Sequence, residues 1–78
     1  GSRLQRYLRG TIYWSPATGA HELYGSIRAR YLTLTPRQRT RLGLPTTGEF
    51  AIPGGRANNF QGGRISWKPT GVRVVILR

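Results

Sequence analysis

His21 and Glu22 are adjacent, and a base beside an acid is an arrangement that general acid–base catalysis uses. Glu22 together with Glu49 would supply the paired carboxylates of a glycosidase. Such groups need burial or a nearby like charge to shift their pKa, whereas a net charge of +11 keeps carboxylates ionised. We therefore predict that this chain is not an enzyme. His21 is expected to tie down a turn, and Glu49 to pair with an arginine or cap a helical turn.

The chain is strongly basic, with 13 Lys and Arg residues against two acidic ones, which implies a negatively charged partner or surface. Twelve of the thirteen are arginine, whose fork suits phosphates and carboxylates. A GC-rich genome gives the same bias without selection for binding. Arginine interleaved with Tyr and Trp also fits stacking on single-stranded nucleic acid, so nonspecific nucleic-acid binding is expected and remains the alternative function. The basic residues are Arg3, Arg6, Arg9, Arg28, Arg30, Arg37, Arg39, Arg41, Arg56, Arg64, Lys68, Arg73 and Arg78.

The length of 78 residues allows one small domain with a thin core. With no Cys and a single His, neither a disulfide framework nor a metal site is expected, and no cofactor is predicted. The longest apolar run, 72–77, is too short to span a membrane, and no signal-peptide pattern is present. Residues 1–2 resemble a tag remnant, which leaves 3–78 as one module.

The chain contains an internal repeat. Three residues recur 53 positions later: Ile12, Trp14 and Pro16 return as Ile65, Trp67 and Pro69. The offset extends backwards, because Arg3 falls on Arg56 and Tyr7 on Phe60. The sequence therefore holds about one and a half repeats of a unit of roughly fifty residues, and such units usually form binding arrays.

Hairpins are predicted at 10–24 and 64–78, because β-branched and aromatic residues flank turn residues in both segments. Between them, 25–43 is expected to be helical. Ser26 is predicted to cap a first helix, and Thr35 with Pro36 begins a second that ends at Gly43. Segment 44–63 is predicted to be a loop with one helical turn at 56–60. These segments define a small α+β single domain of two β-hairpins with two or three short helices, closing on itself as a monomer or weak dimer.

Trp14 and Trp67 stand at equivalent strand positions of the two repeats, which predicts that both belong to the core. Tyr13 alternates with Trp14 along its strand, so it is expected to face solvent. Tyr24 and Tyr31 are the next exposed aromatic residues on this interpretation.

Leu42-Gly43-Leu44-Pro45 resembles the Leu-Gly-Phe-Pro signature of the LGFP repeat family, with Leu44 in place of the Phe. Residues 12–28 resemble the hairpin and helix of that repeat, and 54–67 resemble the stretch that leads into its next hairpin. The similarity covers nearly the whole chain from Tyr7 onward.

The resemblance implies a noncatalytic module that binds peptidoglycan or arabinogalactan in the cell wall of mycolate-bearing actinobacteria. It also implies an extracellular location at the bacterial cell wall, and the targeting of an attached enzyme such as a mycobacteriophage endolysin. We expect the ligand-binding side chains to combine one aromatic residue with hydroxyl, amide and guanidinium groups that suit carbohydrate. They are Tyr13, Thr18, His21, Arg56, Asn58, Asn59, Gln61 and Arg64.

Overall fold

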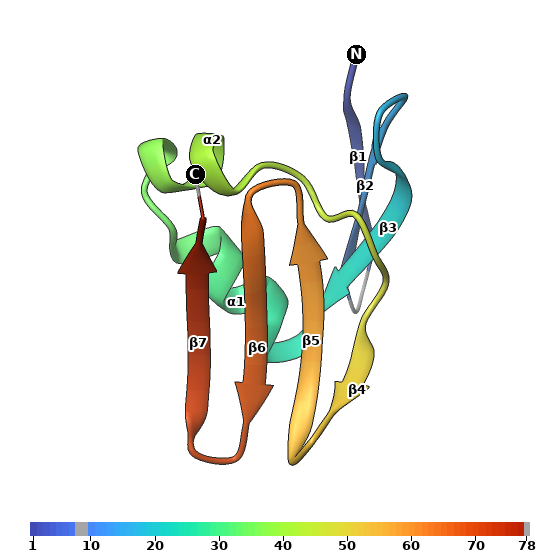
Figure 1. Ribbon diagram of the computed structural model, residues 1–78. Helices are drawn as coiled ribbons and strands as arrows, with labels where there is room; N and C mark the ends of the chain where they lie inside the picture. Colours follow the sequence, from blue (N-terminus) through green and yellow to red (C-terminus); the bar gives the residue numbers. More distant parts are fainter. Residues whose placement is uncertain (8–9, 78) are drawn as a thin grey trace.

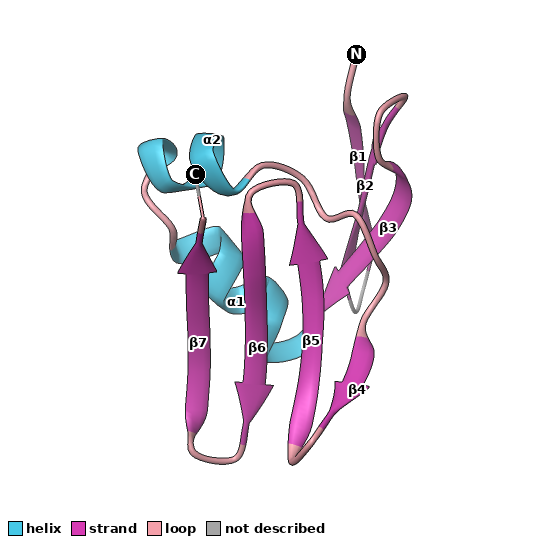
Figure 2. Cartoon of the chain, in the orientation of Figure 1, coloured by secondary structure: helices cyan, strands magenta, loops and turns pink. Residues whose placement is uncertain are grey.

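The computed structural model describes residues 1–7 and 10–77, so that Arg9 and Arg78 lie outside the described residues. Within the described residues the chain forms two antiparallel sheets and two helices, which confirms the small α+β fold (Figure 1, Figure 2). The first sheet has the order β1 (Arg3–Tyr7), β2 (Gly10–Ser15), β3 (Gly19–Tyr24). The helices follow as α1 (Gly25–Thr33) and α2 (Pro36–Leu42). The second sheet has the order β4 (Phe50–Ile52), β5 (Gly55–Phe60), β6 (Gly63–Lys68), β7 (Gly71–Ile76).

The repeated unit is a three-stranded meander, which is one strand more than the predicted hairpin. Arg3 pairs with Trp14 in the first sheet, and Arg56 pairs with Trp67 in the second. This register continues along β1–β2 and β5–β6 with the same 53-residue offset. The internal repeat of the sequence is therefore a repeat of backbone pairing.

The prediction of a loop over 44–63 is wrong, because β4 and β5 lie within it. The predicted helical turn at 56–60 is also wrong, since these residues form most of β5. Asn58 and Asn59 have low intrinsic strand propensity, and pairing with β4 and β6 overrides it. The backbone N–H of Asn59 also donates to Thr47 Oγ1 at 3.1 Å, which holds the preceding loop against the strand.

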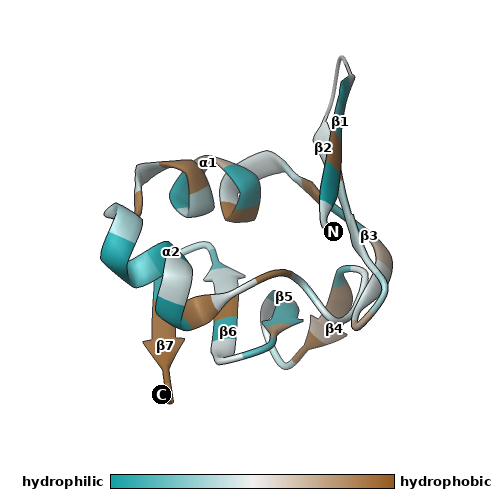
Figure 3. Ribbon diagram, turned by 90° about the horizontal axis from the view of Figure 1, so that it is seen from above, coloured by the Kyte–Doolittle hydropathy of each residue, from teal (hydrophilic) through white to brown (hydrophobic). Residues whose placement is uncertain are grey.

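Helix α1 contacts both sheets. It contacts β2 and β3 of the first sheet and β6 and β7 of the second, and it covers one face of the second sheet in Figure 3. Ile27 and Tyr31 are buried on this helix, one helical turn apart, and they join a core cluster with Leu23 and Ile65. The core is therefore shared by both repeats, and the helix connects them.

The two helices begin differently. The predicted cap at Ser26 is wrong, because α1 starts at Gly25 and its N-cap residue, Tyr24, makes no side-chain cap hydrogen bond. The predicted cap at Thr35 is confirmed: Gln38 N donates to Thr35 Oγ1 at 3.2 Å, and Thr35 N donates to Gln38 Oε1 at 2.9 Å. This capping box satisfies two free N–H groups at the start of α2.

Segment 42–45, which follows α2 along the chain, is hydrogen-bonded to the turn between β5 and β6. Gly43 ends α2 with φ of 77°, a value that favours glycine, as predicted for the helix end. The carbonyl of Leu42 accepts from Gly62 N at 2.8 Å, and that of Leu44 accepts from Gln61 N at 3.0 Å. These backbone bonds hold the β5–β6 turn in one position.

The assignment of faces in the first hairpin is wrong for Tyr13 and Trp14. Tyr13 is only 4% exposed, whereas Trp14 is 37% exposed. Tyr31, also predicted to be exposed, is 2% exposed, while Tyr24 is exposed as expected. Trp67 is half-buried against the core, as predicted. The physical reason is that the two sheets bury opposite faces of equivalent strands, so equivalent residues meet different surroundings.

Candidate functional site: a basic groove at the β5–β6 turn

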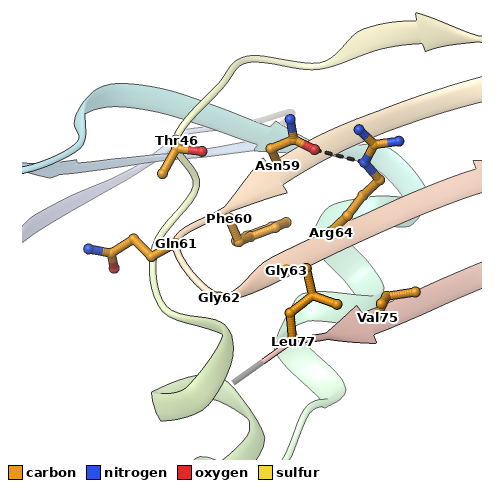
Figure 4. Close-up of a pocket in the computed structure, with 9 residues that line it drawn as sticks. All are labelled: Thr46, Asn59, Phe60, Gln61, Gly62, Gly63, Arg64, Val75 and Leu77. Atoms are coloured by element: carbon orange, nitrogen blue, oxygen red, sulfur yellow. Dashed lines mark hydrogen bonds between the residues drawn. The ribbon is translucent and has the colours of Figure 1, made fainter.

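An open groove of about 560 Å³ lies at the end of the second sheet beside the turn between β5 and β6 (Figure 4). We call it the β5–β6 groove. Its walls combine amide, guanidinium and apolar side chains from β5, β6, β7 and the loop that follows α2. The residues that define it are Thr46, Asn59, Phe60, Gln61, Arg64, Val75 and Leu77.

Arg64 is the charged group of this groove. Its Nε donates to Asn59 Oδ1 at 2.7 Å, from the neighbouring strand β5. Its guanidinium carbon lies 5.3 Å from the ring centroid of Phe50, which fixes the planar group by a cation–π contact. Within the described residues, no hydrogen bond occupies its two Nη nitrogens. An arginine held in this way presents a preorganised fork to a carboxylate, a phosphate or a pair of hydroxyls.

Gln61 forms the opposite side of the groove. Its Oε1 accepts from Leu44 N at 2.9 Å, so the amide oxygen is committed to the backbone of segment 42–45. Gly43 makes this approach possible, because a Cβ at that position would stand 2.6 Å from Gln61 Oε1. Figure 4 shows the amide of Gln61 directed away from Arg64. Gln61 therefore forms one wall of the groove, and no hydrogen bond within the described residues occupies its amide nitrogen, Nε2.

Three of the predicted site residues, Asn59, Gln61 and Arg64, are brought together in this groove.

Arg56 is not among them. Its Nε donates to Glu49 Oε2 at 3.1 Å in a smaller hollow that also includes Tyr24, and this pair confirms the expected partner for Glu49. A hydrogen bond to Glu49 raises the pKa of the Tyr24 hydroxyl above its ordinary value of 10.0.

Thr18 and His21 belong to the turn between β2 and β3. His21 Nε2 lies 2.6 Å from the carbonyl oxygen of Thr18, so the Nε2–H tautomer donates across the turn, as predicted for its structural role. The hydroxyl of Thr18 lies 2.7 Å from Ser15 Oγ and 3.1 Å from the carbonyl oxygen of Gly19. The polar atoms of this turn are thus largely used within the turn.

Tyr13 and Asn58 are buried, which contradicts their selection as ligand-binding side chains. Tyr13 packs edge-on against Tyr31 with ring centroids 5.4 Å apart. Asn58 Nδ2 donates to the carbonyl oxygens of Glu22 and Thr47, at 3.3 and 3.1 Å, and thereby joins the two sheets. Its Oδ1 is a buried atom without a hydrogen-bond partner among the described residues. Both residues are structural.

Sequence reasoning missed two residues that matter for the surface. Phe50 contacts Arg64 but lies within the segment 44–63 that was predicted to be a loop, and no sequence signal placed it beside Arg64. Trp14 is exposed, and the sequence did not indicate this, because both faces of β2 carry only uncharged residues and the repeat suggested the same burial for Trp14 as for Trp67.

The described residues contain no group of three or more His, Cys, Asp or Glu side chains that could hold a metal ion. The helices described here are also too short or too polar to cross a membrane. The polar chemistry of the groove is therefore that of amide, hydroxyl and guanidinium groups.

The fold and the groove together define a small repeat module in which helices and glycine turns position a basic surface. The chain belongs to the LGFP repeat family: the family model, described as LGFP repeat, matches residues 1–35 and 42–77. Segment 42–45 carries the signature of the family, and in this structure its backbone organises the β5–β6 turn. Such modules are often associated with the cell wall and with cell-surface proteins. A search of curated proteins finds no match to this chain.

Proposed function

We propose that this chain is a noncatalytic module that binds an anionic glycan of the bacterial cell wall through the β5–β6 groove. The observation that carries the proposal is the fixed guanidinium of Arg64, bound to Asn59 and stacked on Phe50 at the wall of an open groove. Carboxylate or phosphate groups of a glycan would bind the free edge of this fork, and sugar hydroxyls would bind Gln61 and Thr46.

The face of the second sheet that carries the groove supports this proposal. In the first sheet the equivalent face is buried and carries Thr11 and Tyr13. The second sheet has Arg64 and Ser66 at these positions, and Lys68 and Arg73 lie on the same face. Because charged residues replace core residues, this face is suited to water and to a negative ligand.

The polymer that we propose is the peptidoglycan or arabinogalactan of mycolate-bearing actinobacteria, with the module extracellular at the cell wall. An attached enzyme, such as a phage endolysin, would be held at its substrate by this binding. Each contact in an open groove is weak, so useful retention requires several contacts or several modules. We assign no catalytic step to the chain, since Glu49 is paired with Arg56 and His21 is used in its own turn.

Nucleic acid is the competing ligand for so basic a chain. That alternative depends on arginine interleaved with aromatic rings that are free to stack. Tyr13 and Tyr31 are buried in the core, which removes part of the expected stacking surface and leaves Trp14 and Tyr24 as the exposed rings. We therefore favour the glycan, and a salt titration separates the two ligands, because nucleic-acid affinity falls steeply with salt.

The test is retention of the purified chain by insoluble peptidoglycan–arabinogalactan. We compare Arg64→Gln with Arg37→Gln, an equal loss of charge at an exposed position on α2, away from the groove. We expect Arg64→Gln to lower retention about tenfold, the effect of losing one charge-assisted contact, and Arg37→Gln to leave it nearly unchanged.

Three results contradict the proposal. Equal losses in both variants indicate attraction by net charge without a site at Arg64. Retention no stronger than that of an unrelated protein of similar charge removes the wall glycan as the ligand. A single-stranded oligonucleotide bound more tightly than wall glycan at high salt favours the nucleic-acid alternative.

A further inference from the structure

The two meanders have the same register, but different elements pack against their equivalent faces and edges. This difference identifies a face that is left uncovered in the first meander. In the second meander, Ile65 and Trp67 face α1, with Val72, Val74 and Ile76 of β7 on the same face. Helix α1 covers this face, and Ile27 and Tyr31 pack into the same core. The outer edge of β5 pairs with β4. A complete meander therefore has a helix on one face and a short strand on one edge.

In the first meander, α1 contacts the opposite face, which carries Tyr13, and among the described residues no helix covers the Ile12–Trp14 face. Ile12 and Trp14 stand at the positions of Ile65 and Trp67, yet Ile12 is half-buried and Trp14 is 37% exposed. Within the part of the chain that the structure describes, no strand pairs with the outer edge of β1. A hollow of about 210 Å³ lies on this side of the sheet, lined by Arg3, Gln5, Ile12 and Trp14 among others.

The Ile12–Trp14 face has the same residue types at these two positions in both repeats, unlike the opposite face, which carries the groove in the second sheet. Ile and Trp are retained at both repeat positions, although in the first sheet they meet solvent. On the opposite faces, by contrast, the residue types follow exposure: Tyr13 is buried where Ser66 is half-exposed. The repeat therefore places on this partly exposed face the same two apolar residues that α1 covers in the second meander.

We propose that the Ile12–Trp14 face and the free edge of β1 receive the helix and short strand of a further repeat unit. The occupant has the chemistry of residues 25–54 of this chain: an amphipathic helix with an Ile and a Tyr one turn apart, followed by a strand like β4. Glu22 stands where the second meander has Val74, and Arg3 lies on the same face with its guanidinium carbon 5.8 Å from the ring centroid of Trp14, so the added helix would meet one charge of each sign. The proposal does not depend on the glycan-binding function.

The test is an extended chain in which residues 25–54 are repeated directly before Ser2. This junction places the added helix at the same distance from β1 as α1 stands from β5, because Ser2 and Gly55 are 53 residues apart. Both the original and the extended chain carry Trp67→Phe, so that Trp14 alone reports by fluorescence. The matched control carries Ile27→Ser and Tyr31→Ser in the added copy only.

We expect acrylamide quenching of Trp14 to fall at least about twofold in the extended chain, and hydrogen exchange of the β1 amides to slow by about tenfold. The control should behave like the original chain. As a second measurement, Trp14→Ala should lower the urea midpoint of the extended chain and leave that of the original chain nearly unchanged.

An extended chain in which Trp14 stays as accessible as before, or one whose protection persists in the control, overturns the proposal. Protection of Trp14 in the original chain by raised protein concentration alone would assign the face to a second copy of this chain. Protection by wall glycan would assign it to carbohydrate. Either of these results would also reject the proposed occupant.

Discussion

The hydroxyl of Tyr31 donates a hydrogen bond of 2.8 Å to the carbonyl oxygen of Gly43. This bond joins the core helix α1 to the signature segment of the LGFP repeat. The ring of Tyr31 stacks on Phe60 with centroids 5.2 Å apart, and Arg39 lies 4.7 Å over the same ring. One side chain therefore links α1, α2, the signature segment and β5, and its loss should destabilise the whole fold.

Tyr31→Phe keeps the ring packing and removes only the hydrogen bond. We expect the free energy of unfolding to fall by about 1–3 kcal/mol, because the carbonyl of Gly43 loses its partner in a partly buried position. Urea unfolding followed by circular dichroism measures this change. Tyr24→Phe is the control: it also removes a hydroxyl, but one that is exposed and bonded to the carboxylate of Glu49, so stability should change by less than about 0.5 kcal/mol.

Stability should also depend on alkaline pH through Tyr31. Burial raises the pKa of its hydroxyl above the ordinary value of 10.0, so the folded state holds this proton more tightly than the unfolded state does. The resulting stabilisation is complete below pH 10.0 and is lost as pH rises through the pKa of the folded state. Thermal unfolding between about pH 8 and pH 11 measures the loss, and Tyr31→Phe should reduce its slope. An equal slope in that variant would assign the effect to other groups.

Tyr13 and Trp14 should respond in opposite ways to truncation. Tyr13→Ala removes a ring that is 4% exposed and should cost ~3–5 kcal/mol, enough to unfold much of so small a domain. Trp14→Ala removes an exposed ring and should leave the chain folded. The amide dispersion of the two variants in NMR spectra separates these outcomes. A folded Tyr13→Ala variant with native dispersion would contradict the burial of Tyr13.

Gly43→Ala should destabilise the chain through both backbone and packing. Its φ of 77° is strained for alanine, and the new Cβ would stand 2.6 Å from Gln61 Oε1. We expect a loss of ~1–3 kcal/mol, seen as a lower urea midpoint. Gly48→Ala is the comparison, since a Cβ at Gly48 meets no atom within 4 Å and φ there is not positive. Equal effects at the two glycines would show that the contact between Gly43 and Gln61 is unimportant.

Arg64→Lys tests whether geometry or charge matters in the groove. Lysine keeps the charge but has no planar fork to bind Asn59 and stack on Phe50 at the same time. We expect wall retention to fall nearly as far as in Arg64→Gln, with the fold unchanged by circular dichroism. Full retention by the lysine variant would indicate that a point charge is sufficient.

Much of the fold was predictable because the repeat and the helix signals are local. Thr35, Pro36 and Gly43 mark the ends of α2 by their own backbone chemistry. The strand β5 was not predictable in this way, since Gly55 and its two asparagines favour turns, and its pairing partners supply the stability. The offset between Arg3 and Arg56 nevertheless indicated that β1 and β5 share one structure.

The candidate site was less predictable because it depends on which face of each sheet is buried. Alternation shows that Tyr13 and Trp14 point in opposite directions, but it does not say which direction is the core. The repeat suggested equal surroundings for Trp14 and Trp67, whereas α1 covers only the second of them. Asn59, Gln61 and Arg64 were chosen for their amide and guanidinium chemistry, and the structure brings them together in one groove because they flank the same glycine turn.

Helix α1 is encoded between two meanders and also contacts both of them. The boundaries of the duplicated sequence unit therefore differ from the boundaries of the unit that packs together, which includes α1 and parts of both meanders. A gene duplication of one full period can begin at any point of the repeat, because the added sequence always contains one helix that can pack against a neighbouring sheet. A cut within α1, in contrast, leaves both neighbouring meanders incomplete, so recombination between such genes should preserve this helix whole.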